Sequence, residues 1–446
     1  MTITPDDIAA LVLKHYDALP AKRKPVVRSN GLREWVPLAG IVAQGENDEL
    51  FCLSMATGMK CLPSSKVAQA QGNVLHDWHA EILAIRAFNR FVLDECKALA
   101  QGGLSKFLRR RTSDEMSNSC LGEIGERRHW HGQPFEWRED VILHMYCSEA
   151  PCGDASMELI MDSQEDATPW ELPQEITTTA SPCTLPGRAY FSHLGIVRRK
   201  PARPDAPPTL SKSCSDKLAL HQITSLLSSI PSLLVSPSNA YLYSLILPLS
   251  RYSATACHRA FSSSEGGRMS SLAHLLHPSC TPTPQGGYAF RPFTISTTTS
   301  EFTYSQKQAK ETAGASDIAP SNLALAWTAS GLEEATLGGV LQGRKQSSAD
   351  KKGASFASRR RLWGLAVEVV GLLSISPLCS PLLDPGPGPR DGGEIELDPQ
   401  KALGAETYGE IKESVLLEAR RGIKKEARAE ALKGWMRNLG DESFRL

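Results

Sequence analysis

The sequence has no excess of charge of either sign. Its 446 residues include 49 lysines and arginines and 49 aspartates and glutamates, so the formal net charge at pH 7 is zero. Any binding to nucleic acid must therefore depend on clustered basic residues and not on a generally basic chain. The sequence also has no internal repeat and no apolar run of membrane-spanning length, so we expect no membrane association.

The sequence has no regular cysteine spacing and no obvious export signal. Its 11 cysteines are odd in number and irregularly spaced, which does not indicate a disulfide framework. The first residues resemble a capped helix start, with Thr4 at the N-cap and Pro5 in the first turn, and not a signal peptide. We therefore expect an intracellular protein, in the nucleus, the cytoplasm or both, and not a secreted one. The sequence indicates no obligate protein partner.

Hydrophobic patterning predicts an α/β fold. A helix with one apolar face is expected over 81–96, and strands are expected at 38–44, 50–57, 140–148, 240–249 and 324–329. These elements predict a mixed sheet flanked by helices, within one large domain that spans 1–446.

The remaining segments are predicted to surround this domain. Residues 1–35 are expected to form an N-terminal helical segment, and 101–138 and 377–400 are expected to be loop insertions. Apolar residues four apart predict one long C-terminal helix over 405–439, whose other faces are rich in lysine and arginine.

Two short motifs carry chemistry. His79 precedes Glu81 by two residues at the start of the helix at 81–96, and Cys152 follows Pro151 after an apolar strand. Imidazole nitrogens and thiolate sulfurs are the usual ligands of Zn²⁺ in proteins. A glutamate beside such a metal, but not bound to it, can carry protons. Either motif alone is common in buried structural positions, and their combination is what favours a catalytic metal.

A catalytic zinc needs a third protein ligand. The residue one helical turn after Cys152 is Ala155, so the ligand must come from elsewhere. Cys214 is the best candidate because it precedes a run expected to form a helix from Leu218 through Ile230. A cysteine at a helix start lies near free N–H groups, which favour the thiolate. Cys120, Cys147 and Cys183 compete with it on chemistry alone.

Taken together, the motifs resemble those of the adenosine-to-inosine RNA-editing deaminases. The matching segments are His79-Ala80-Glu81, Pro151-Cys152-Gly153-Asp154 and Ser213-Cys214-Ser215-Asp216-Lys217, and Thr57-Gly58-Met59-Lys60-Cys61 resembles a strand end of the same family. The resemblance implies a cytidine-deaminase-like fold with a C-terminal helical extension. It also implies one Zn²⁺ held by His79, Cys152 and Cys214, with Glu81 as the catalytic acid–base.

The resemblance also implies a buried inositol hexakisphosphate, linked to the zinc site by a relay that includes Lys217. Many basic side chains cannot be buried without a counter-charge, which such a polyanion would supply. The positions that match the family's cofactor-binding residues are Arg86, Lys217, Tyr408, Lys412, Trp435 and Asp441. Leu220 and His221 depart from the family pattern, and a solvated helix face is the ordinary alternative for most basic residues near the C-terminus.

Basic residues just before Cys214 are candidates for RNA contacts. They form the run Arg198, Arg199, Lys200 and Arg203, and Lys60 resembles the family's lysine beside the target phosphate. Phosphate contacts supply most of the affinity for nucleic acid, although a solvated loop is the alternative.

The sequence favours a tRNA substrate within this family. Only about 35 residues precede the first strand, which is too few for a double-stranded-RNA-binding domain, and the 198–209 run resembles fungal members of the tRNA-specific branch. That branch modifies adenosine 37, next to the anticodon of alanine tRNA, in a loop of unpaired bases. Two alternatives remain open: an editor of structured mRNA and a non-catalytic RNA-binding subunit.

Overall fold

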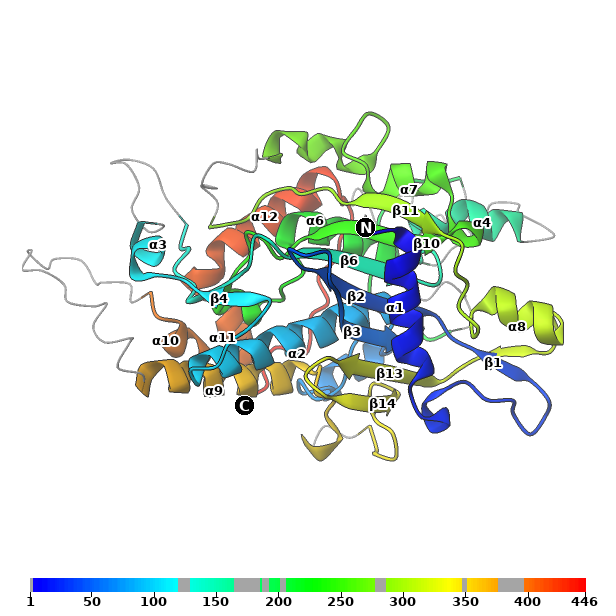
Figure 1. The fold of residues 1–446 in the computed structure, drawn as a ribbon, viewed down its shortest axis with the longest axis horizontal. Coiled ribbons are helices and arrows are strands. Elements are labelled where there is room, and N and C mark those ends of the chain that lie inside the picture. Colours follow the sequence, from blue (N-terminus) through cyan, green and yellow to red (C-terminus); the bar gives the residue numbers. More distant parts are fainter. Residues whose placement is uncertain are drawn as a thin grey trace, which may run out of the picture.

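The computed structural model describes residues 3–118, 129–163, 185–186, 192–200, 206–276, 286–346, 351–375 and 397–446. An eight-stranded mixed sheet forms its centre, in the order β11-β10-β6-β2-β3-β13-β14-β15 (Figure 1). β10 is parallel to β6 and β11, and the other pairs are antiparallel. The strands are β2 (Leu38–Gln44), β3 (Leu50–Thr57), β6 (Ile142–Cys147), β10 (Leu242–Pro248), β11 (Thr294–Thr298), β13 (Leu323–Thr328), β14 (Glu333–Leu337) and β15 (Val340–Leu341). The predicted α/β class and its mixed sheet are confirmed.

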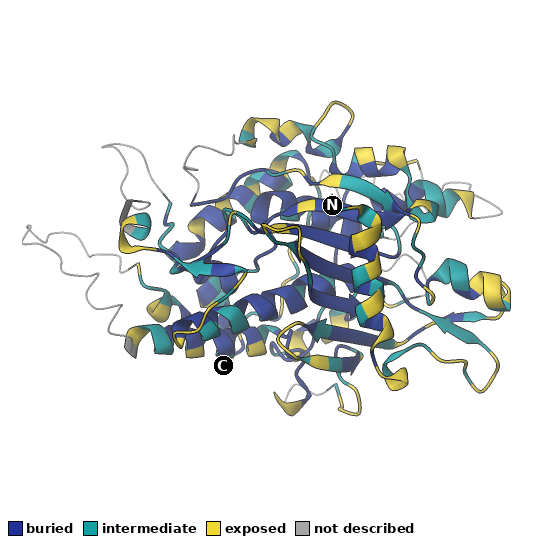
Figure 2. Cartoon of the chain, in the orientation of Figure 1, coloured by how far each residue is buried: buried dark blue, intermediate teal, exposed yellow. Residues whose placement is uncertain are grey.

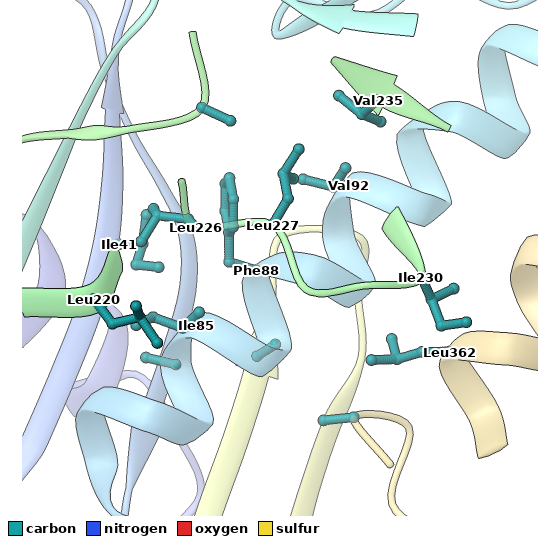
Figure 3. Packing of buried hydrophobic residues seen from close by; sticks show 14 of the residues in the cluster. Ile41, Ile85, Phe88, Val92, Leu220, Leu226, Leu227, Ile230, Val235 and Leu362 are labelled. Carbon is teal, nitrogen blue, oxygen red and sulfur yellow. The ribbon is translucent and has the colours of Figure 1, made fainter. Parts of the chain in front are cut away.

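Both faces of the sheet are covered by apolar cores. Along β2, Ile41 belongs to the core that contains helix α2 (Ala80–Ala100), whereas Val42 belongs to the core that contains α1 (Pro5–Asp17). This alternation follows from the period of two of a β-strand. On the α2 side, Figure 3 shows Phe88 and Val92 among side chains from the 220–235 segment and from α9 (Arg359–Ile375). Figure 2 shows that the central strands are almost entirely buried.

Smaller elements surround this layered centre. β1 (Arg33–Trp35) pairs with β12 (Ile318–Pro320), and β5 (Phe135–Trp137) pairs with β4 (Leu108–Arg110) and β9 (Val235–Ser236). A further pair joins β7 (Leu185–Pro186) to β8 (Arg198–Arg199). The helices not yet given are α3 (Ser113–Asn118), α4 (Met157–Asp162), α6 (Cys214–Thr224), α7 (Ala254–Phe261), α8 (Gln306–Ala313), α10 (Pro399–Leu403), α11 (Tyr408–Glu413) and α12 (Glu418–Glu430). Within the described ranges, none of these helices combines the length and apolar character needed to cross a membrane.

The predicted C-terminal helix over 405–439 is wrong as a single element. The chain forms α11 and α12, separated by a 3₁₀ turn at Val415–Leu417. Ser414 causes the break, because its backbone is extended and its side chain accepts a hydrogen bond from the N–H of Leu416. After α12 the chain turns again, and Gly434 has a positive φ of 84°. Spacing of four residues predicted the buried face but not these interruptions.

Three other predicted boundaries also need correction. The segment 101–138 is not only loop, because it contributes β4, α3 and β5. Within 1–35 only α1 is an α-helix, and the later part contains β1. The helix predicted from Leu218 through Ile230 begins at Cys214 and ends at Thr224, because Ser225 takes a positive φ of 56°. Of the predicted insertion 377–400, residues 377–396 lie outside the described residues, and α10 begins at Pro399.

The sheet register brings several strand ends to one edge. Leu38, at the start of β2, is opposite Thr57, at the end of β3, and Ala39 is opposite Cys147, at the end of β6. The segments that follow β3 and β6 therefore leave the sheet at the same edge, on either side of β2. They lead to His79 and to Cys152.

Candidate active site and metal centre

His79 and Glu81 lie at the start of α2. His79 is the N-cap residue, and its Nδ1 lies 2.9 Å from Oδ1 of Asp77, which also accepts a hydrogen bond from the His79 backbone N–H. A carboxylate partner of this kind commonly orients a metal-ligating histidine. Glu81, in the first turn, is buried. Burial raises the pKa of its carboxyl, and the neighbouring Cys152 raises that pKa further.

Cys152 and Cys214 lie in two segments that are joined by hydrogen bonds. The N–H of Cys214 donates to Sγ of Cys152 at 3.3 Å, and the N–H of Ser215 donates to the Cys152 carbonyl at 3.0 Å. Gly153 permits this approach, because a Cβ there would lie 2.3 Å from Oγ of Ser213. Ser213 is the N-cap of α6 and accepts from the N–H of Asp216, so Cys214 occupies the first helical position.

An arginine from α7 fixes the Cys152 segment from the other side. Nε of Arg259 lies 3.0 Å from the buried carboxylate of Asp154, and both its terminal nitrogens bind Glu158. Asp154 also accepts a hydrogen bond from the N–H of Gly195, at 2.9 Å. Asp154 thus ties the loop that carries Cys152 to the segment that leads to Lys200. Sequence spacing gave no signal for Arg259.

The thiols of Cys152 and Cys214 have pKa values shifted in opposite directions. A hydrogen bond from Cys214 holds the pKa of the Cys152 thiol well below its usual range, and the positive charge of Lys200 acts in the same direction. Burial raises the pKa of the Cys214 thiol. Cys152 is therefore the first of the pair to become a thiolate, which is the form that binds a metal.

Lys200 was expected to contact RNA, and that prediction is wrong. The side chain is buried, and its Nζ lies 3.2 Å from Sγ of Cys214 and 2.9 Å from Oδ2 of Asp77. The same carboxylate oxygen is bound by Lys217 and, at 2.6 Å, by Ser211. A continuous chain of polar contacts therefore runs from Cys214 through Lys200 and Asp77 to Lys217. The sequence analysis missed Asp77, although its position two residues before His79 was a usable signal.

A second possible donor set lies beside the first. The ligand atoms of Cys61, Asp77 and His79 all lie within 4.8 Å of one another, and Sγ of Cys61 is 3.6 Å from Nδ1 of His79. His79 is common to both sets. Asp77 is already engaged by Lys200 and Lys217, which makes its carboxylate a weaker candidate for direct ligation. The metal content of variants in which one of these cysteines is replaced distinguishes the two donor sets.

The positions of the competing cysteines in the fold distinguish Cys147 from Cys214. Cys147 remains inside β6, where burial raises the pKa of its thiol well above the usual range, so it is poorly suited to ligation. Cys120 and Cys183 lie outside the described residues. Cys214 is the cysteine that the structure places against Cys152.

The other expected RNA contacts have different outcomes. Arg198 is buried with 1% of its surface exposed and donates to the carbonyl of His193, so its predicted phosphate contact is wrong. Arg199 is partly exposed, in β8. Lys60 is exposed and donates to Oδ1 of Asn322, close to the site. Arg203 lies outside the described residues.

Comparison with known proteins decides the family. Residues 54–438 match the model of the adenosine-deaminase (editase) domain. The chain belongs to this adenosine-deaminase family. It is 39% identical over 315 residues to "tRNA-specific adenosine deaminase 1" of Schizosaccharomyces pombe, which covers 70% of this chain and 73% of that protein.

More distant relatives carry related names. The protein of the same name from Saccharomyces cerevisiae is 34% identical over 236 residues, which is 50% of this chain and 54% of that protein. A mouse "Double-stranded RNA-specific editase B2" is 27% identical over 231 residues, or 47% of this chain and 26% of that protein. The matched part of this chain therefore covers about half of the budding-yeast relative and about a quarter of the mouse relative.

In this chain, several lysine and arginine side chains lie close together where α12 packs on α6. We call Lys212, Lys217, Arg420, Lys424 and Arg428 the C-terminal cation cluster. Burial lowers the pKa of Lys424 well below its usual range, and the charges of the two arginines lower it further. Burial and the charge of Lys217 lower the pKa of Lys212 to about 7. Within the described part of the chain, the buried Nε atoms of Arg420 and Arg428 have no hydrogen-bond partner.

Residues expected to bind a polyanion lie around this cluster. The ring of Trp435 lies under Lys212 and Arg428, at 5.9 and 5.4 Å, and Lys412 lies 6.0 Å from the ring of Tyr408. Lys412 also pairs with Glu442, and two other expected residues have protein partners. Arg86 is partly buried and donates to the carbonyl of Ala357, and Asp441 binds His76, Arg359 and the N–H of Gly72. Asp441 thereby directs Arg359, which lies 5.5 Å from the ring of Tyr408.

Proposed function

We propose that this editase hydrolyses adenosine to inosine in tRNA, at adenosine 37 of alanine tRNA, with a zinc ion held by His79, Cys152 and Cys214. The observation that carries the reaction is a buried Glu81 carboxylate beside two cysteines that are in contact with each other. The tRNA substrate is supported by the names of the most similar relatives described above. The donor set of one imidazole and two thiolates is typical of zinc and leaves one position for water.

The chemistry follows from the positions of the side chains. Zinc, when bound, would lower the pKa of a water molecule and so supply a hydroxide. Glu81 accepts the water's proton and passes it to the adenine ring as the C6–O bond forms. It then assists the transfer of a proton to the leaving amine, so that the C6–N bond breaks and ammonia departs. The raised pKa of Glu81 suits a group that must both accept and return a proton. The target base must be flipped out, because C6 is inaccessible within a stack.

The reaction is tested by mapping inosine in three RNAs. We expect the holoprotein to form inosine at position 37 of alanine tRNA, and we expect a zinc chelator to abolish that activity. A second tRNA and a perfect RNA duplex serve as comparison substrates. Editing of the duplex with alanine tRNA unchanged would overturn the tRNA assignment in favour of mRNA editing. No inosine in any RNA, from protein with full metal content, would overturn the reaction itself.

We also propose that the C-terminal cation cluster, with Trp435, Tyr408 and Lys412, holds a polyanion, inositol hexakisphosphate. The fit is supported by buried cations that lower one another's pKa values and by unpartnered guanidinium nitrogens. A buried charge without a counter-charge is strongly destabilising. A phosphate-rich ligand supplies those charges, and Lys217 would connect it to the polar chain that reaches Cys214.

The polyanion proposal predicts a releasable cofactor. Denaturing the purified protein should release about one inositol phosphate per chain, which mass spectrometry of the supernatant would detect. A Lys424→Met variant, which removes one partly buried charge, should require less counter-charge from a ligand and should lose the inositol phosphate more readily. Lys425→Met, on the exposed side of the same helix, is the matched control. A folded, active wild-type protein that releases no polyphosphate would contradict the proposal.

A further inference from the structure

A basic hairpin extends from the N-terminal part of the chain. We use this name for residues 22–35, which include β1. The N–H of Arg28 donates to the carbonyl of Leu32 at 2.9 Å, and the N–H of Glu34 donates to the carbonyl of Val26 at 2.9 Å. The turn at 29–31 is exposed. Figure 1 shows the hairpin as a dark-blue loop that protrudes at the lower right, beyond β1, and Figure 2 shows much of it as exposed.

The basic hairpin concentrates positive charge in a chain that has none overall. Its basic residues are Lys22, Arg23, Lys24, Arg28 and Arg33, and its single acidic residue is Glu34. Because the whole chain is neutral, this segment is a local departure from its surroundings. A local excess of charge is what attracts a polyanionic partner to one part of a neutral surface.

The five cations divide into two groups. Arg23 pairs with Glu333, and Arg28 pairs with Glu34 and donates to the carbonyl of Pro320, so these two fix the hairpin to its surroundings. In the described part of the chain, no carboxylate pairs with the other three, Lys22, Lys24 and Arg33. Lys24 donates to the carbonyl of Asp17 and lies 6.0 Å from the ring of Tyr16. Arg23 and Arg28 therefore hold the hairpin in place. Among the described residues, the other three basic residues have no paired carboxylate.

The basic hairpin is next to the catalytic edge of the sheet. β1 ends at Trp35, three residues before Leu38, which is opposite Thr57 in the sheet register. The carbonyl of Trp35 accepts from the N–H of Ser321, and the following residue, Asn322, is bound by Lys60. Lys60 precedes Cys61, which contacts His79. A short path of direct contacts thus joins the hairpin to the metal centre.

We propose that the basic hairpin binds phosphates of the RNA that presents the target adenosine. The inference rests on the proposed function, because it takes the substrate to be tRNA. Two of the basic residues expected to do this from sequence, Arg198 and Lys200, are buried and bonded to protein groups. The hairpin supplies one exposed cation, Lys22, and two partly exposed ones, Lys24 and Arg33, in the segment that leads into β2 at the edge of the sheet near the site. Its contacts position the RNA backbone and do not read bases.

The test removes charge without breaking an ion pair. The triple variant K22A/K24A/R33A should bind alanine tRNA about tenfold more weakly at about 0.1 M salt. The slope of log affinity against log salt concentration should become less steep by about 2. Each phosphate contact contributes about 0.7–0.9 to that slope through counterion release, and three contacts are removed. Metal content and melting temperature should stay unchanged. The charge-conserving variant K22R/K24R/R33K should restore both the affinity and the slope.

A matched control separates a specific contact from general charge. K345A/K351A/K425A removes the same number of charges from exposed positions elsewhere, none of which is ion-paired in the described part of the chain. This variant should keep wild-type affinity and salt slope. An equal loss in the control, or no loss in K22A/K24A/R33A while the wild type still forms inosine in tRNA, would overturn the hairpin proposal alone. A wild type that forms no inosine in tRNA overturns the proposed function instead.

Discussion

Glu81→Gln is expected to fold, to retain its metal and to lose at least about a hundredfold in the rate of deamination, the usual range for removing a general acid–base. The amide has nearly the volume of the carboxyl, so the buried position stays filled. It cannot accept the water's proton. The loss should appear in single-turnover experiments with saturating RNA, because saturation makes the measured rate independent of the affinity for RNA.

Glu334→Gln is the matched control for this experiment. Glu334 is also a glutamate whose pKa is raised by burial, and it binds Ser355 and the N–H of Phe356 in a different part of the molecule. This variant is expected to lower stability without changing the single-turnover rate of the folded protein. Near-normal turnover by a folded, metallated Glu81→Gln protein would rule out its proton-transfer role and would assign that role to another group.

Cys214→Ser is expected to abolish both tight zinc binding and deamination, whereas Cys61→Ser is expected to retain zinc. Serine replaces the soft sulfur by a hydroxyl that stays protonated and binds zinc poorly. The contact between Cys214 and Cys152 makes this pair the expected ligand set, even though Cys61 also lies near His79. Elemental analysis of the purified variants, after dialysis against a weak chelator, measures the difference.

The opposite pattern would reassign the metal centre. Full zinc in Cys214→Ser together with loss of zinc in Cys61→Ser would place the ion on Cys61, Asp77 and His79. Both variants need a check of folding, because Cys214 is fully buried at the start of α6. The Cys214→Ala variant provides it, since alanine is well tolerated in a first helical turn and cannot bind metal.

The elements that sequence predicts well here are those whose signal is local. The apolar face of α2 and the alternation along β2 reflect periodicities that survive in the folded chain. The helix that follows Cys214 was also predicted, although it begins at Cys214 itself and not at Leu218, because Ser213 serves as its N-cap. The end of the same helix was not, because Ser225 adopts a positive φ that its residue type does not signal.

The predictions that failed concern long-range contacts. Lys200 stands in a run of basic residues, which ordinarily indicates a solvated loop. Its real partner, Asp77, lies 123 residues away in the chain. The basic hairpin was missed for the converse reason, since the importance of its charge depends on the pairing of β1 with β12 and on the contact between Lys60 and Asn322. The helix break at Ser414 was a local signal that the apolar spacing obscured.

The separation of the two paired cysteines affects how the protein matures. Cys152 and Cys214 are 62 residues apart, and His79 is further still from Cys214. Closing such long loops costs conformational entropy before any ligand atom can share a metal. Contacts of this range also form late in folding. If the proposed ligands hold the metal, we therefore expect its loading to follow formation of the sheet and of the Ser215 and Arg259 contacts.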